Sequence, residues 1–438
     1  MMFKLLILSV LLGATLLIVS CATGEQTDRP YQEIGRSKHF TLESDGIIIG
    51  FEKRSIRRKN AAILGEYQNQ PLYANLAEPL TNEDGLNKKR NKLFRRYAYF
   101  NSKIMMPTQI VCQFDQRQTF VYNAYDTDLG GHYDYTESFE QLKVTFQQLK
   151  THNVGGGKYT HIIVMNMGWN NDQAVSLWRY NTMIRELRIR AQKTGDKFNP
   201  FVVAITWPSV WRSINDFTLS KKLFHMISYP NKTLDADELG VTWMNWIIND
   251  QLPRLIDKTK ADAPKLVLIG HSLGARILSR AVFATDHLLE NKESDAVDLL
   301  IGLQPAFSAT RFVTGKGLEG SPYAEFRKKK TRLVFTTSVN DDANPVANYI
   351  TGAKHLGGRK GLAYARKHAV NTTAGAPYDI QTWSDQSLEE VPSYDKGVVL
   401  IDASSIVEDN ENQKLSAHND ILDDEMAELI WHHISALE

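Results

Sequence analysis

The 438-residue chain has little cysteine and no excess of charge of either sign. Cys21 and Cys112 are its two cysteines, too few for a disulfide framework or a cysteine-rich zinc site. The 51 basic side chains are balanced by 50 acidic ones, so the protein offers no overall field that would hold nucleic acid. The acids between Asp126 and Glu137 have the spacing of a calcium loop, but a predicted strand precedes them where a helix should stand. We therefore expect no nucleic-acid partner, no metal and no cofactor.

Near the N-terminus, the apolar run Leu5–Val19 is shorter than the roughly 20 residues that span a bilayer as a helix. It follows Lys4 and ends just before Cys21, which is typical of a signal-peptide core. The sequence Ile18-Val19-Ser20-Cys21 resembles a bacterial lipoprotein signal, in which the chain is cut before the cysteine and the cysteine is lipidated. The resemblance implies a signal peptide at residues 1–20 and a lipid anchor on Cys21. The protein would then be held on a membrane of the bacterial cell envelope, with the outer membrane favoured.

The composition, 42% hydrophobic and 23% charged, is that of an ordinary folded protein whose length allows more than one domain. We assign residues 21–105 to an N-terminal region of undetermined structure, with one predicted strand at Gly46–Phe51. Residues 106–438 form the larger domain, which opens with predicted strands at Gln109–Phe114 and Thr119–Tyr125.

The rest of the larger domain alternates short apolar runs with helical periodicity. The predicted strands are Ile162–Met165, Phe201–Ile205, Leu266–Ile269, Leu299–Leu303, Leu333–Phe335 and Val398–Ile401, and the predicted helices include Thr182–Gln192, Val241–Leu255, Ala275–Leu289 and Asp424–Ile434. Strands that are apolar throughout are covered by helices on both faces. The alternation therefore predicts an α/β fold with a mostly parallel, doubly wound sheet. The long connection Val210–Leu239 is a candidate cap over a site.

The sequence Gly270-His-Ser272-Leu-Gly274 lies between an apolar strand and an amphipathic helix. Gly-x-Ser-x-Gly in this context is typical of a nucleophile elbow, in which a strained turn exposes the serine hydroxyl above the sheet. Carboxyl ends of parallel strands are also where open α/β sheets bind ligands. Ser272 is therefore the predicted nucleophile.

A serine nucleophile needs a base and an acid, and in this kind of fold they follow in the order Ser, acid, His. His418 lies between the last predicted strand and the last predicted helix, where a loop can return over the elbow. The acid should follow the strand Leu333–Phe335, which makes Asp341 the first candidate and Asp342 its competitor. A residue after another strand, such as Asp402, is a further alternative. The acid would orient the imidazole and stabilise its charged form.

An oxyanion hole should use the backbone N–H of Leu273, directly after the nucleophile. The second N–H should come from the loop after the strand Ile162–Met165. Gly168 allows a close turn there, and Trp169 is the candidate donor.

Three segments of the chain resemble the α/β-hydrolase superfamily and, within it, a bacterial group of uncharacterised hydrolases. They are Met167-Gly168-Trp169-Asn170-Asn171, Trp207-Pro208-Ser209 and Gly270-His271-Ser272-Leu273-Gly274-Ala275-Arg276. The family usually has histidine where this chain has Met167. The likeness covers residues 105 to 438 and implies an α/β-hydrolase fold, but not a substrate.

Together these features predict a serine hydrolase of the carboxylesterase or lipase type, which cleaves a small-molecule or lipid ester with Ser272, Asp341 and His418. The same residues would serve an acyltransferase or a peptidase. A non-catalytic envelope protein that keeps the fold as an interaction module is the opposing hypothesis. The sequence leaves the oligomeric state open.

Overall fold

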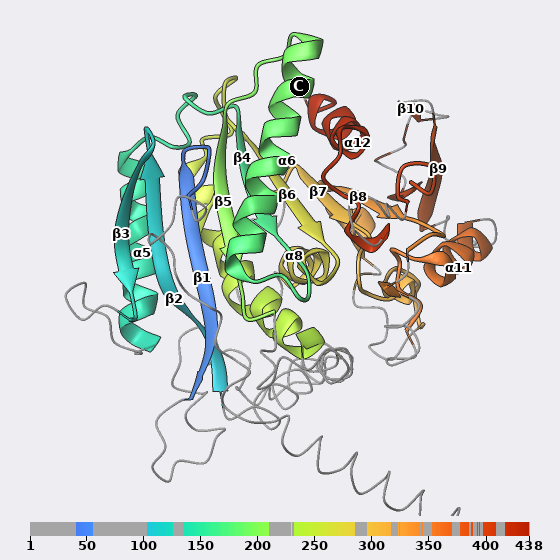
Figure 1. The fold of residues 1–438 in the computed structure, drawn as a ribbon, viewed down its shortest axis with the longest axis horizontal. Helices are drawn as coiled ribbons and strands as arrows, with labels where there is room; N and C mark the ends of the chain where they lie inside the picture. Colours follow the sequence, from blue (N-terminus) through green and yellow to red (C-terminus); the bar gives the residue numbers. More distant parts are fainter. Residues whose placement is uncertain are drawn as a thin grey trace, which may run out of the picture.

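The computed structural model describes residues 41–55, 103–125, 135–209, 229, 232–284, 296–316, 323, 325–341, 343–344, 353–369, 377–384, 387–388, 392, 394, 397–408 and 417–437 (Figure 1). The predicted signal peptide, Cys21, most of the segment Asp126–Glu137 and Asp342 lie outside the described residues.

Within these residues, an 11-stranded sheet has the order β10-β9-β11-β8-β7-β6-β4-β5-β1-β2-β3. The strands are β1 (Gly46–Ser55), β2 (Lys103–Phe114), β3 (Arg117–Asn123), β4 (His161–Asn166), β5 (Pro200–Thr206), β6 (Lys265–His271), β7 (Leu299–Leu303), β8 (Arg332–Thr337), β9 (Tyr378–Ser384), β10 (Ser387–Leu388) and β11 (Val398–Asp402). The long helices are α5 (Tyr135–Thr151), α6 (Gln173–Thr194), α8 (Leu273–Phe283), α11 (Arg359–Ala369) and α12 (Asp424–Ser435). Short π or 3-10 turns are η4 (Gly240–Met244), η5 (Ile247–Gln251), η6 (Pro253–Leu255), η7 (Ala309–Phe312), η8 (Phe326–Lys328) and η10 (Ala417–Asn419).

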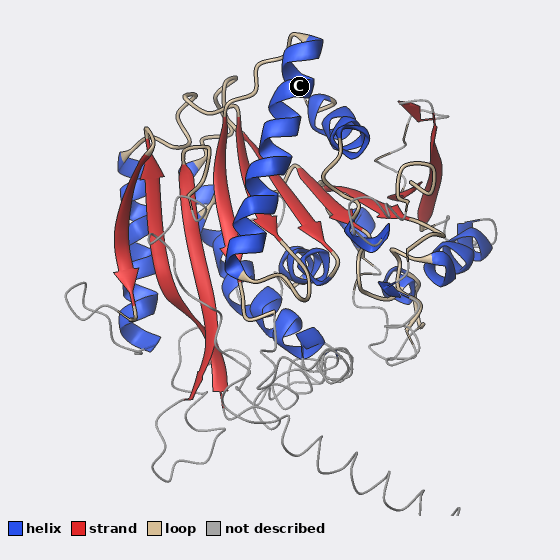
Figure 2. Cartoon of the chain, in the orientation of Figure 1, coloured by secondary structure: helices blue, strands red, loops and turns tan. Residues whose placement is uncertain are grey.

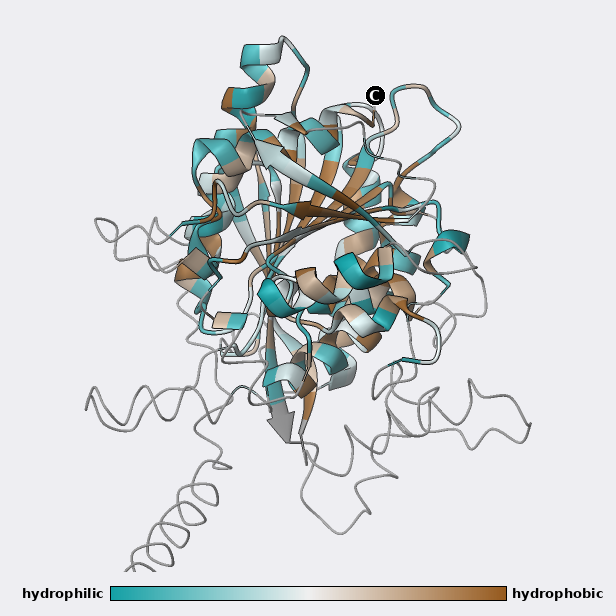
Figure 3. Cartoon of the chain, turned by 90° about the vertical axis from the view of Figure 1, so that its right-hand side faces the viewer, coloured by the Kyte–Doolittle hydropathy of each residue, from teal (hydrophilic) through white to brown (hydrophobic). Residues whose placement is uncertain are grey.

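The sheet is mainly parallel, as the sequence predicted. Every pair of neighbours from β9 to β1 in this order is parallel, and antiparallel pairing involves only the edge strands β10, β2 and β3 with their neighbours. Strands β4, β5 and β7 are buried at every residue, because helices cover both faces and no strand surface is left for water. Figure 3 shows brown, hydrophobic strands at the centre of the molecule, between helices that mix hydrophilic and hydrophobic residues.

The two faces of the sheet carry separate apolar clusters. One face packs against α5, α8 and the helical segment that contains η4 and η5, and the other packs against α6 and α12. Figure 2 shows the strands in red with α6 crossing in front of them. This two-sided cover confirms the doubly wound arrangement.

Residues on both sides of the predicted boundary at residue 105 contribute to the same sheet. Strand β1, from the region left undetermined by the sequence, pairs in parallel with β5 and antiparallel with β2. Ile47, Ile48 and Ile49 of β1 are fully buried. The strand predicted at Gly46–Phe51 is thus confirmed, and it lies inside the sheet.

Other differences lie in the helices and in the candidate cap. Helix α6 begins at Gln173, nine residues before the predicted start at Thr182, because Asp172 caps it by accepting a hydrogen bond from Val175 N. From the candidate cap Val210–Leu239, residues 232–239 are helical and buried in the body of the protein. Residues 210–228 of that segment lie outside the described part of the chain.

Strands β4 and β6 are neighbours, but the chain leaves them in opposite directions across the sheet, toward β5 and toward β7. This is a topological switch point, where the connections diverge and leave a crevice at the carboxyl ends of the strands. None of the described helices is long and apolar enough to cross a membrane.

Candidate active site

Ser272 occupies the turn between β6 and α8 at the switch point. Its backbone has φ 55° and ψ −118°, a conformation that costs a non-glycine residue about 1–3 kcal/mol. The turn is held because Ser272 N donates to Leu303 O at 2.9 Å and Ser272 O accepts from Ala306 N at 3.1 Å. The strand, strained turn and helix predicted around Ser272 are confirmed.

Gly274 lets the start of α8 touch the neighbouring strand. A Cβ atom at this position would lie 1.9 Å from Asn166 O at the end of β4, so no other residue fits without moving the helix. The glycine of the motif therefore sets the distance between helix and sheet at the elbow.

Gly168 brings the loop after β4 against the nucleophile. A Cβ atom at Gly168 would lie 2.5 Å from Ser272 Cβ and 3.0 Å from Ser272 Oγ. Trp169 follows directly, and Leu273 is the first residue of α8, whose N–H has no partner within the helix. The two candidate oxyanion donors are thus on segments that flank Ser272.

The loop that carries Trp169 is fixed by three side chains from neighbouring elements. Trp207 Nε1 donates to Met167 O at 2.8 Å, and Tyr180 OH accepts from Met167 N at 2.9 Å. Ser209 Oγ accepts from Asn171 N at 3.1 Å. Because the first two contacts use the backbone of Met167, they do not depend on the side chain at this position.

Asp341 and His418 form a hydrogen-bonded pair. Asp341 follows β8 and His418 lies in η10, and His418 Nδ1 is 2.8 Å from Asp341 Oδ2. Since the carboxylate accepts, His418 Nδ1 carries the proton of this hydrogen bond, which is the tautomer that a base acting through Nε2 would need. Burial favours the neutral carboxyl of Asp341, but the charge that His418 carries when protonated and the hydrogen bonds from His418 and Asn344 outweigh it and hold the pKa of Asp341 below its ordinary value.

The His418 loop is tied to the elbow through His271, the residue before Ser272. His271 Nε2 donates to His418 O at 2.8 Å, and the two imidazole rings are 4.8 Å apart between centroids. Burial, then the charges of His418 and Arg179, hold the pKa of His271 well below its ordinary value, so this ring is neutral. Its Nε2–H is therefore the proton that binds the loop.

In the described part of the chain, Ser272 Oγ makes no hydrogen bond with the His418 ring. Nucleophile-to-base contacts are often long in the unliganded state of an enzyme and shorten when substrate binds. The alternative acid Asp402 is engaged elsewhere, with Arg366 Nη2 at 2.9 Å. The structure thus joins two of the three predicted residues directly and the third through its neighbour.

Asn344 and His355 extend the hydrogen-bond chain behind Asp341, and no sequence pattern marks either residue for this role. Asn344 Nδ2 donates to Asp341 Oδ2 at 2.7 Å, and Asn344 Oδ1 lies 3.0 Å from His355 Nδ1. Burial, then the charges of Arg276 and Arg311, lower the pKa of His355 to about 3. A neutral His355 therefore donates its Nδ1–H to Asn344, and this fixes the orientation of the acid.

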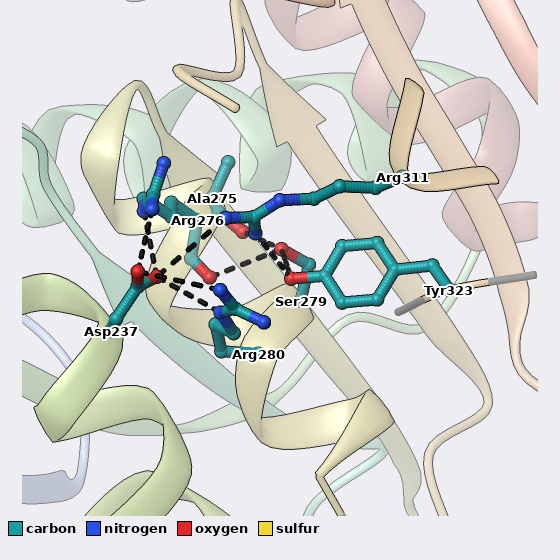
Figure 4. Close-up of polar contacts among 7 residues, drawn as sticks. All are labelled: Asp237, Ala275, Arg276, Ser279, Arg280, Arg311 and Tyr323. Atoms are coloured by element: carbon teal, nitrogen blue, oxygen red, sulfur yellow. Dashed lines mark hydrogen bonds and ion pairs between the residues drawn. The ribbon is translucent and has the colours of Figure 1, made fainter. Parts of the chain in front are cut away.

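A second polar cluster lies along α8 (Figure 4). Asp237 accepts from Arg276 Nε at 2.7 Å and from Arg280 Nε at 2.9 Å, and Arg311 Nη2 is 3.9 Å away. Arg311 also donates to Tyr323 OH at 2.7 Å. All four charged side chains are buried. The cluster joins α8 to the helical segment before η4 and to η7.

No protein-family model matches this chain, and neither does any curated protein. Among solved structures, a phospholipase, PlaB from Legionella pneumophila in complex with thio-NAD, aligns with a TM-score of 0.26 and 15% sequence identity. The alignment covers 51% of this chain and 46% of the phospholipase, so the chain spans about half of that protein's length. The likeness is too slight to carry the role of any residue over to this chain.

Proposed function

We propose that this protein is an α/β-hydrolase that cleaves an ester or a related acyl bond with Ser272 as nucleophile. His418 is the general base and Asp341 orients it. The observation that carries the proposal is the hydrogen-bonded Asp341–His418 pair tied to a strained serine at the switch point of the sheet. An unremarkable strand-to-helix turn would need neither the strain nor the pair beside it.

In this reaction Ser272 Oγ attacks the substrate carbonyl carbon while its proton moves to His418 Nε2. The negative charge on the carbonyl oxygen is stabilised by the N–H groups of Leu273 and Trp169. The carbon–oxygen bond to the leaving group then breaks, and the departing alcohol takes the proton from His418. Water enters, gives a proton to His418 and releases the acid from Ser272, which recovers its proton.

The direct test is the hydrolysis of p-nitrophenyl butyrate by Ser272→Ala and His418→Ala. The residues of a triad act as a unit, so each change should lower kcat by a factor on the order of 10⁶. Circular dichroism and thermal unfolding control for loss of fold. A folded Ser272→Ala protein with half of the wild-type rate would refute the mechanism, and a wild-type protein without any esterase activity would favour the interaction module.

We further propose that the mature protein is anchored by lipid on Cys21 at a membrane of the bacterial cell envelope. The support is the sequence alone, from the apolar run before Cys21. Cys21→Ser should move the protein from the membrane fraction to the soluble fraction, because lipid on this residue would be the main anchor. Unchanged fractionation of Cys21→Ser would contradict the anchor and would leave the catalytic proposal untouched.

A further inference from the structure

Arg179 on α6 is a buried cation without a carboxylate partner among the described residues. Its side chain belongs to a residue that is 7% exposed, and its Nη2 donates to Asn419 Oδ1 at 3.0 Å. The Nε and Nη1 atoms are buried and have no hydrogen-bond partner in the described part of the chain. By contrast Arg190, on the same helix, pairs with Asp424 at 3.0 Å and Glu428 at 2.6 Å.

A guanidinium cannot lose its proton to escape burial, since arginine stays charged in proteins. Buried charges are for this reason almost always paired. The amide oxygen of Asn419 satisfies one N–H group but supplies no negative charge. An anion bound beside Arg179 would therefore balance the buried charge.

The location of Arg179 connects it to the candidate active site. Asn419, which Arg179 holds, directly follows His418. The charge of Arg179 also reaches His271, where it adds to burial and to His418 in lowering the pKa of the ring. Neutral His271 keeps a lone pair on Nδ1, which would repel an anion, so the contacts to an anion must come from Arg179 itself.

We propose that Arg179 binds a small inorganic anion of the halide class beside the loop that carries His418. The ion sits at the Nε–H or the Nη1–H edge of the guanidinium and compensates its charge. A small ion suits a side chain this deeply buried, because a carboxylate or phosphate group on a larger molecule would bring the rest of that molecule with it. Binding does not depend on the proposed hydrolase function.

The first test measures thermal unfolding while sodium bromide replaces sodium gluconate at constant ionic strength. A ligand that binds only the folded protein raises Tm, and we expect a rise of about 2 °C or more at bromide well above its Kd. Arg179→Met keeps the length of the side chain and removes its charge, so its Tm should not respond to bromide. Arg185→Met is the matched control, since Arg185 lies on the same helix, is half exposed and pairs with Glu43 at the surface at 3.8 Å.

Arg185→Met should respond to bromide as the wild type does. Equal responses of the wild type and Arg179→Met would overturn the proposal, as would a wild-type Tm that does not respond. If Arg179→Met does not fold, crystals of the wild-type protein grown with bromide decide the question. An anomalous peak at hydrogen-bond distance from Arg179 Nε or Nη1 is expected, and its absence at saturating bromide would overturn the proposal.

If the proposed hydrolysis also holds, the anion cancels a positive charge near His418 and favours the imidazolium that forms during the reaction. Bromide should then raise kcat of the wild type several-fold with little change in KM, and leave kcat of Arg179→Met unchanged. A protein that binds bromide at Arg179 but lacks esterase activity would contradict the proposed function and leave the anion site standing.

Discussion

Helix α8 carries two buried polar clusters that are built in opposite ways. At its N-terminus, Ser272 has a strained backbone, and the carboxylate of Asp341 is hydrogen-bonded to the His418 ring rather than to the serine. Along its flank, Asp237 is shared by three guanidinium groups in one compact ionic cluster. Under the proposed function the first arrangement supplies a nucleophile and a base, whereas in the second the charged groups are paired with one another.

Buried charge by itself does not mark a functional site. Both clusters are buried, and the Asp237 cluster has the more extreme electrostatics, since its arginines hold the pKa of Asp237 well below the ordinary value against the effect of burial. What separates them is position. Ser272 stands at the carboxyl ends of strands at the switch point, where ligands bind, while Asp237 joins one helix to another beneath it. Changes in the first cluster should affect rate, and changes in the second should affect stability.

Among the changes that distinguish the two clusters, we expect the largest effect, on kcat, at Asp341 in the first cluster. Asp341→Asn keeps the size of the side chain but favours the wrong tautomer of His418, and it should lower kcat by about 10⁴. Asp342→Asn should lower kcat by less than about tenfold. Steady-state hydrolysis of p-nitrophenyl butyrate measures both, and the reverse order would move the acid to Asp342.

The second cluster should respond to Asp237→Asn with a loss of stability. Removal of its carboxylate charge leaves three buried guanidinium groups around a neutral amide, and breaking such a group costs about 3–5 kcal/mol. Urea unfolding should show the lower free energy of unfolding. The kcat of the folded variant should stay within about threefold of the wild type, because Asp237 contacts no reacting atom. A large fall in kcat with unchanged stability would erase the distinction between the clusters.

The smallest effect is expected where His271 ties the His418 loop to the elbow. His271→Leu removes the donor to His418 O and should lower kcat by about 10² through displacement of the base, with KM little changed. Gln can place an N–H near the position of Nε2, so His271→Gln should recover much of the rate. Equal losses in the two variants would mean that the hydrogen bond does not position His418.

The elbow could be predicted from the sequence because its signal is local. The apolar strand, the two glycines around Ser272 and the amphipathic helix are consecutive in the sequence. Each of them is needed to build the strand–turn–helix unit. The pairing of Asp341 with His418 spans 77 residues, yet their places after a strand and before the last helix were enough to suggest it. The sequence left Asp341 and Asp342 as competing candidates for the acid. Adjacent residues in a turn differ in the direction in which their side chains point, and the sequence does not specify that direction.

The supporting residues could not be predicted, because their partners are distant in sequence and their types are common. Arg276 and Asp237 are 39 residues apart, and no pattern marks either as a buried partner of the other. Asn344 and His355 orient Asp341 by contacts that depend on how two loops fold. Strand β1 was recognised, but its place between β5 and β2 depends on pairing across the chain, which hydrophobic patterning does not specify.

Labelling with a fluorophosphonate shows whether Ser272 is the activated nucleophile that we propose. The reagent forms a covalent bond with a serine only when a base activates its hydroxyl. Mass spectrometry of the digested wild-type protein should find the adduct on the peptide that contains Ser272, and Ser272→Ala should carry none. A folded wild-type protein that stays unlabelled, or an adduct on a different serine, would contradict the role of Ser272 as nucleophile.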